Sequence, residues 1–194
     1  MIISVTNRKL CSGDFLKRIE LIAKHKPYMI ILREKDMDFD SYTNLAEKVY
    51  SICKKYNVTM AVNSRTDTAE KLGIKNVHVP VKMLEDNPDL SRKFITGVSV
   101  HSVYEAETAC KLGAEYLIAG HIFATDCKKG LEPRGLKYLS EIVRASDIPV
   151  FAIGGIKHEN IGKVLETGAD GFCIMSELMQ CSDSDFPSDY FDIM

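Results

Sequence analysis

The chain has 194 residues, enough for one domain with a buried core, and 45% hydrophobic and 27% charged residues are ordinary for a globular protein. The formal net charge of −2 gives no basic field, so we expect no nucleic-acid partner, and any anionic ligand must be held by local groups. No stretch approaches the roughly 20 apolar residues of a membrane span, and the first residues do not resemble a signal peptide. With six scattered cysteines and no C-x-x-C pair, the sequence predicts a cytoplasmic protein without membrane contact.

Eight short apolar runs alternate with amphipathic, helix-like stretches along the chain. The runs are rich in Val and Ile and are mostly unbroken by polar residues, which is typical of strands buried on both faces. In chain order they cover residues 2–6, 28–32, 58–62, 77–79, 97–100, 116–122, 149–153 and 172–175. Strict alternation predicts a parallel sheet, either a closed (β/α)8 TIM barrel or a doubly wound sheet with fewer units. The barrel is favoured, because no G-x-G-x-x-G motif follows the first run.

The predicted barrel is a single α/β domain over residues 1–194, with a short or irregular last helix. Residues 180–194 are acidic and contain Pro187, so they make a poor long helix. We expect the aromatic residues Phe186, Tyr190 and Phe191 of this acidic C-terminal segment to pack on the barrel or on a partner subunit.

The strongest local signal is the glycine pair Gly154 and Gly155, which directly follows a predicted strand. Glycines let a backbone approach an anion, and free N–H groups followed by a helix start attract phosphate. Met175 and Ser176 end the last predicted strand, and phosphate sites after the seventh and eighth strands recur in this barrel. The alternative is that the glycines only make a tight turn.

Two further groups of polar residues follow predicted strands. Arg33 and Lys35 alternate after the second strand and so point to one side, where they could hold a carboxylate or a phosphate. Asn63 and Arg65 add an amide and a cation after the third strand. In the alternative interpretation, these residues form a solvated strand end.

A histidine, His121, stands at the end of the sixth predicted strand and opens a polar loop that runs to residue 132. Histidine titrates near neutral pH and can take and return a proton. A structural, hydrogen-bonding histidine is the alternative. The sequence has no Gly-x-Ser-x-Gly elbow, no P-loop and no metal-spaced set of cysteines and histidines.

Taken together and in order, these segments resemble the thiamine phosphate synthase/TenI superfamily over about residues 31–179. The resemblance is carried by Leu-Arg-Glu-Lys at 32–35, Gly-Val-Ser-Val-His-Ser at 97–102, Ala-Ile-Gly-Gly-Ile at 152–156 and Gly-Ala-Asp-Gly at 168–171. It implies a TIM barrel, a small phosphorylated substrate and a homodimer.

The resemblance offers two enzymatic branches. Thiamine phosphate synthases join a pyrimidine diphosphate to a thiazole phosphate using magnesium. Here Ile31 stands in place of the glutamine of their usual Gln-x-Arg-x-Lys segment. Ser64 and Met83 stand where the two magnesium-binding acids are expected. Because magnesium prefers carboxylate oxygens, these departures argue against a metal–diphosphate site.

The segment 120–132 resembles the other branch, the TenI-type thiazole tautomerases, whereas synthases usually carry proline at position 121. The sequence therefore predicts an isomerase that aromatises a carboxythiazole phosphate without metal or cofactor, with His121 as base and then acid. The alternatives are a thiamine phosphate synthase and a non-catalytic ligand-binding protein. The resemblance implies phosphate contacts from Gly154, Gly155, Met175 and Ser176, and substrate contacts from Arg33, Lys35, Asn63, Arg65, Ser99, Thr125 and Lys128.

Overall fold

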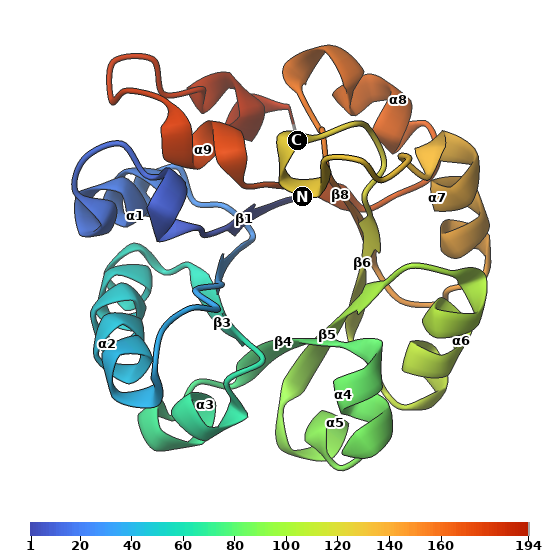
Figure 1. Cartoon of the computed structure of the whole chain (residues 1–194), viewed down its shortest axis with the longest axis horizontal. Helices are drawn as coiled ribbons and strands as arrows, with labels where there is room; N and C mark the ends of the chain where they lie inside the picture. Colours follow the sequence, from blue (N-terminus) through green and yellow to red (C-terminus); the bar gives the residue numbers. More distant parts are fainter. Residues whose placement is uncertain (194) are drawn as a thin grey trace. The chain divides into compact units, whose positions relative to one another are not determined.

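The computed structural model describes residues 1–193, in which eight parallel strands form a closed barrel in chain order (Figure 1). The strands are β1 (Ile2–Val5), β2 (Met29–Leu32), β3 (Thr59–Asn63), β4 (Asn76–Pro80), β5 (Ile95–Val100), β6 (Tyr116–Gly120), β7 (Val150–Ile153) and β8 (Gly171–Ile174). The predicted (β/α)8 barrel is thus confirmed over the doubly wound sheet. The sixth strand is shorter than the predicted 116–122, because it ends at Gly120 and His121 begins a loop.

Helices separate the strands, and side-chain caps begin several of them. The α-helices are α1 (Phe15–Lys24), α2 (Phe39–Tyr56), α3 (Thr66–Leu72), α4 (Val81–Asp86), α5 (Leu90–Lys93), α6 (Val103–Lys111), α7 (Gly135–Arg144), α8 (Ile161–Leu165) and α9 (Ser176–Gln180). Short 3-10 turns are η1 (Arg8–Leu10), η2 (Asp126–Lys128), η3 (His158–Asn160) and η4 (Ser188–Asp192). Asp14, Asp38 and Ser102 each accept a backbone N–H at a helix start, which satisfies one otherwise unpaired donor. The last helix, α9, has only five residues, as the sequence predicts.

The chain divides into two compact units, residues 1–77 with 174 onward, and residues 78–173. In the first unit β1, β2 and β3 pair in parallel, and α1 and α2 lie side by side (Figure 1). In the second unit β5, β6 and β7 pair in parallel, and β7 continues the ladder to β8. That the whole chain is one domain stays a prediction.

The acidic C-terminal segment follows α9 and lies beside α1 within the first unit (Figure 1). The rings of Phe186 and Phe191 stack on His25, the C-cap residue that follows α1, with ring centroids 5.0 and 5.2 Å away. Tyr190 is 2% exposed, and its hydroxyl donates to the carboxylate of Glu177 in α9. Whether these aromatic residues also meet a partner subunit stays a prediction.

None of the helices within residues 1–193 is both long and apolar enough to cross a bilayer.

Candidate functional site

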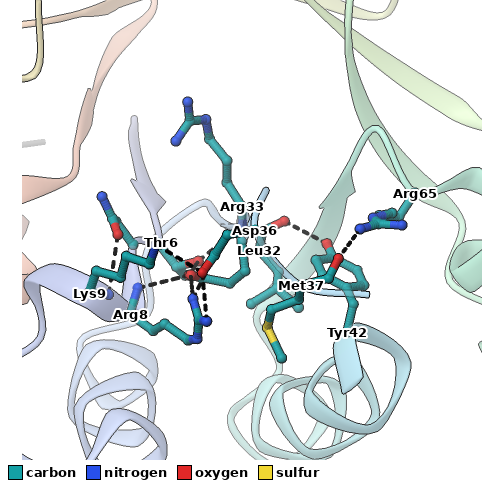
Figure 2. A network of polar contacts seen from close by, with 11 residues as sticks. Thr6, Arg8, Lys9, Leu32, Arg33, Asp36, Met37, Tyr42 and Arg65 are labelled. Atoms are coloured by element: carbon teal, nitrogen blue, oxygen red, sulfur yellow. Dashed lines mark hydrogen bonds and ion pairs between the residues drawn. The ribbon is translucent and has the colours of Figure 1, made fainter. Parts of the chain in front are cut away.

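At the carboxyl ends of β1 and β2, a buried carboxylate joins the two strands (Figure 2). Glu34 is 3% exposed and accepts the Thr6 hydroxyl at 2.7 Å and the Arg8 backbone N–H at 3.0 Å. Thr6 in turn accepts the backbone N–H of Arg33 at 3.0 Å. Because side chains alternate along an extended chain, burial of Glu34 leaves Arg33 and Lys35 to point away from it. Figure 2 shows the side chain of Arg33 extending away from this network.

The charged side chains around this junction differ in the hydrogen bonds and ion pairs that they form. Arg8 binds the Asp36 carboxylate through two hydrogen bonds of 2.7 and 2.8 Å, and Lys9 lies 3.0 Å from it. The hydrogen bonds from Arg8 hold the pKa of Asp36 well below its usual range. Within residues 1–193, by contrast, the guanidinium of Arg33 has no hydrogen bond or ion pair. Arg33 is therefore the cation of this group with unused donors for an anionic ligand.

Arg65 follows β3 and is already used in the structure. Its guanidinium donates to the Met37 carbonyl and lies 5.3 Å from the ring centroid of Tyr42 (Figure 2). The Tyr42 hydroxyl donates to the Leu32 carbonyl at 2.7 Å, and burial raises the pKa of Tyr42. Arg65 thus ties the loop after β2 to the start of α3. Asn63, the other residue predicted here, ends β3.

In the second unit, the loop after β6 packs against the glycine pair after β7. The backbone N–H groups of Ile122 and Phe123 donate to the carbonyls of Ile153 and Gly154 at 2.9 and 3.0 Å. A Cβ on Gly154 would lie 2.3 Å from the His121 Cβ, and one on Gly155 would lie 2.5 Å from the Ala124 carbonyl oxygen. Both glycines also have positive φ, +99° and +65°. The glycine pair is therefore required by this close approach, whether or not a phosphate binds.

The glycine pair still offers donors to an anion. The Gly155 carbonyl accepts the Asn160 side-chain amide at 2.9 Å, so the carbonyls on this turn are occupied. In the described part of the chain, no acceptor takes a hydrogen bond from the N–H of Gly154 or Gly155. The expected contribution of a helix dipole needs correction, because η3 has three residues and α8 only five. Any anion here would depend on the individual N–H groups.

Met175 and Ser176, the other predicted phosphate ligands, belong to the first unit. Met175 is the N-cap residue of α9 and Ser176 is its first residue. A joint phosphate site with the glycine pair stays a prediction.

His121 is 9% exposed, and its Nε2 lies 3.4 Å from the Leu131 carbonyl oxygen. Two backbone bonds lead to Leu131: its N–H donates to the Lys128 carbonyl at 3.1 Å, and the Lys128 N–H donates to the Thr125 carbonyl at 3.0 Å. The loop with Thr125 and Lys128 is thus linked to His121 through backbone groups, while the Lys128 side chain is exposed. These contacts match the structural interpretation of His121.

A buried polar cluster on β4, β5 and β6 adds to what the sequence indicated. Ser99, a predicted substrate ligand, lies with its Oγ 2.7 Å from His78 Nε2, and His78 Nδ1 lies 3.3 Å from the Tyr116 hydroxyl. The Tyr116 ring takes the space a side chain on Gly97 would need, since a Cβ there would lie 1.9 Å from its Cζ. The sequence places these three residues on separate predicted strands, and only the folded structure shows that their side chains meet.

The residues present do not fit a magnesium ion held by carboxylates. Within residues 1–193, no group of three or more histidine, cysteine or acidic side chains is placed to hold a metal ion. Glu34 and Asp36 are committed to Thr6, Arg8 and Lys9. Ser64 and Met83 bring no carboxylate.

Comparison with known proteins decides the family. The family model described as thiamine monophosphate synthase (TMP-TENI) matches residues 2–178. The chain belongs to this family. It is 35% identical over 185 residues to a thiamine-phosphate synthase of Fusobacterium nucleatum, covering 92% of this chain and 89% of the relative. A thiamine-phosphate synthase of Clostridium tetani is 34% identical over 181 residues, covering 90% and 86%.

A solved structure of thiamine phosphate pyrophosphorylase from Pyrococcus furiosus is also similar to this chain. It matches with a TM-score of 0.84 and 28% identity, covering 98% of this chain and 93% of the other. The predicted superfamily is thus confirmed.

The predicted thiazole tautomerase is wrong, because these relatives carry the name of the synthase. The isomerase assignment and the acid–base role of His121 in that reaction fall with it. In physical terms, the prediction relied on a proton-competent histidine. The structure places its Nε2 against a backbone carbonyl and its Cβ against Gly154.

Proposed function

We propose that this protein is a transferase of the thiamine-phosphate synthase type, which joins a pyrimidine diphosphate to a thiazole phosphate and releases diphosphate. The observation that carries the proposal is the 35% identity to a thiamine-phosphate synthase over nearly the whole length of both chains. The family-model match to residues 2–178 covers the ends of all eight strands, where the catalytic residues of TIM barrels lie.

Two separate anions must be held in this reaction, and the chain offers two sets of donors that could hold them. On the first unit, Arg33 and Lys35 follow β2 and would bind the diphosphate. As the bond to carbon breaks, negative charge grows on the leaving oxygen, and cations already in place stabilise it. The unengaged guanidinium of Arg33 supports this role. Arg65 already donates from Nη2 to the Met37 carbonyl, so only its other N–H groups would be available to the diphosphate.

On the second unit, the N–H groups of Gly154 and Gly155 would bind the phosphate of the thiazole. Two charge-assisted hydrogen bonds from fixed backbone groups orient a phosphate without side-chain entropy. The turn is held rigid by the bonds from Ile122 and Phe123 to Ile153 and Gly154. The bound phosphate would then fix the position of the thiazole ring.

Synthases of this superfamily use magnesium, and the carboxylates that would bind it are missing at Ser64 and Met83. In this proposal, the cations that follow β2, Arg33 and Lys35, balance the charge of the diphosphate.

A coupling assay tests the proposal directly. The purified protein is mixed with hydroxymethylpyrimidine diphosphate and thiazole phosphate, with and without added magnesium, and thiamine phosphate and released diphosphate are both measured. We expect equal amounts of the two products. Binding of both substrates without any coupling under either condition would contradict the proposal and favour a ligand-binding protein.

A further inference from the structure

Residues 33–38 connect β2 to α2, and they include both cations proposed to bind the diphosphate, Arg33 and Lys35. This segment, the β2–α2 loop, contains no helix or strand. Within it, the N–H of Met37 donates to the Glu34 carbonyl at 3.4 Å, which is long for such a bond. The arrangement of the two cations therefore depends mainly on the groups that hold the loop from outside.

The first part of the β2–α2 loop is held by residues that follow β1. The carboxylate of Glu34 accepts the Thr6 hydroxyl at 2.7 Å and the Arg8 N–H at 3.0 Å. The Arg8 guanidinium binds the Asp36 carboxylate at 2.7 and 2.8 Å. Because these contacts are made at Glu34 and Asp36, the end of the loop at Met37 needs an anchor of its own.

Arg65 provides this second anchor (Figure 2). It precedes α3, and its Nη2 donates to the Met37 carbonyl. The same guanidinium lies 5.3 Å from the ring centroid of Tyr42, which is 1% exposed. The Tyr42 hydroxyl donates at 2.7 Å to the carbonyl of Leu32, the residue directly before the loop. Arg65 therefore rests on a buried ring that is itself bonded to β2, and from there it holds the far end of the loop.

We propose that Arg65 is a positioning residue of the coupling reaction, which keeps the β2–α2 loop in the shape in which Arg33 and Lys35 bind the diphosphate. This role rests on the proposed function, which supplies the diphosphate. A loop that is ordered before the anion arrives loses little conformational entropy on binding, so its affinity is higher. Arginine suits the task, because its planar guanidinium can lie over an aromatic ring and still donate hydrogen bonds.

The variant Arg65→Met tests the proposal. Methionine keeps a long apolar side chain that can cover Tyr42, but it has no donor for the Met37 carbonyl. Calorimetric titration with inorganic diphosphate should give a Kd about tenfold higher than that of wild type. Trypsin added to the native, ligand-free protein should cleave after the exposed Lys35 at least about threefold faster, because the loop opens more often. The fragment that ends at Lys35 is identified by its mass.

Lys54→Met is the matched control. Lys54 lies near the other end of α2, with its Nζ 4.5 Å from the ring centroid of Tyr50. This substitution also removes a cation from a tyrosine ring, but it leaves the β2–α2 loop untouched. Both the Kd and the rate of cleavage after Lys35 should equal those of wild type. Arg65→Lys keeps the charge and a donor, so it should fall between wild type and Arg65→Met in both measurements.

Any other combination of results overturns the proposal. Weaker diphosphate binding with unchanged cleavage would make Arg65 a direct ligand, and faster cleavage with an unchanged Kd would make it a structural residue only. Circular dichroism checks folding, and Arg65→Lys decides in the same way if Arg65→Met does not fold. Wild-type protein that binds diphosphate but forms no thiamine phosphate would contradict the proposed function and leave both measurements on Arg65 intact. Absence of diphosphate binding would overturn both.

Discussion

The hydroxyl of Thr6 donates to the buried carboxylate of Glu34 at 2.7 Å and so joins the end of β1 to the end of β2. The same carboxylate accepts the backbone N–H of Arg8 at 3.0 Å on both oxygens. Glu34 belongs to the Leu-Arg-Glu-Lys segment, in which the sequence predicted that the two cations, Arg33 and Lys35, bind an anion. The structure shows that the acid between them is the anchor that fixes their direction.

Replacing this anchor should destabilise the fold. Glu34→Ala leaves the Thr6 hydroxyl and the Arg8 N–H without their acceptor, which should lower the free energy of unfolding by about 2–4 kcal/mol. Urea denaturation followed by circular dichroism measures the change. Glu47→Ala, on the exposed face of α2, is the matched control and should stay within about 0.5 kcal/mol. Equal effects of the two substitutions would contradict the anchoring role.

A methyl group on Gly155 should be poorly tolerated. Gly155→Ala puts a Cβ 2.5 Å from the Ala124 carbonyl oxygen at a φ of +65°, so we expect a loss of about 1–3 kcal/mol. Gly162→Ala in α8 is the control, because a Cβ there meets nothing within 4 Å and should stabilise the helix by up to about 1 kcal/mol. Thermal unfolding of both variants provides the measurement. A Gly155→Ala variant as stable as wild type would show that loop 121–124 does not require the glycine.

The contact between Arg8 and Asp36 should make stability depend on pH. The pKa of Asp36 is depressed in the folded state, so its contribution is present above the ordinary carboxyl pKa. It is lost as the pH falls through the depressed value. Asp36→Asn should therefore be less stable than wild type at neutral pH, and the difference should disappear in strong acid. Denaturation midpoints across the acidic range test this, with Asp147→Asn, an exposed carboxylate away from this cluster, as control.

Removing the unengaged cation should impair coupling more than folding. Arg33→Gln is expected to lower kcat/KM for thiamine phosphate formation by about 10²-fold, because a positive donor to the developing diphosphate charge is lost. Its melting temperature should match that of wild type, since the guanidinium makes no bond within residues 1–193. Arg92→Gln, at an exposed ion pair with Asp89, controls for loss of positive charge. A similar rate loss in both variants would argue against a specific role for Arg33.

The sequence by itself determined the barrel and its family. Eight Val- and Ile-rich runs separated by amphipathic stretches leave few alternatives, because strands buried on both faces and helices with one apolar face carry their periodicity in the sequence. The segments at 32–35 and 152–156 then indicated the superfamily, which the comparisons confirmed. The choice of branch was wrong, because it rested on single residues such as His121, Ser64 and Met83. A side chain's chemistry depends on its neighbours, which spacing does not reveal.

Only the tertiary structure decided which polar residues already form hydrogen bonds or ion pairs within the protein. Arg65 and Arg33 are both cations that follow a strand, yet one donates to the Met37 carbonyl and the other makes no such bond. Gly154 and Gly155 proved to be packing requirements as well as possible phosphate donors, because loop 121–124 crosses them within contact distance. The contact between the Arg18 guanidinium and Cys181 was equally hidden, since contacts between distant segments arise only when the chain packs. Local patterns determine the helices and strands, whereas these long-range contacts determine which hydrogen-bond donors and charges remain available.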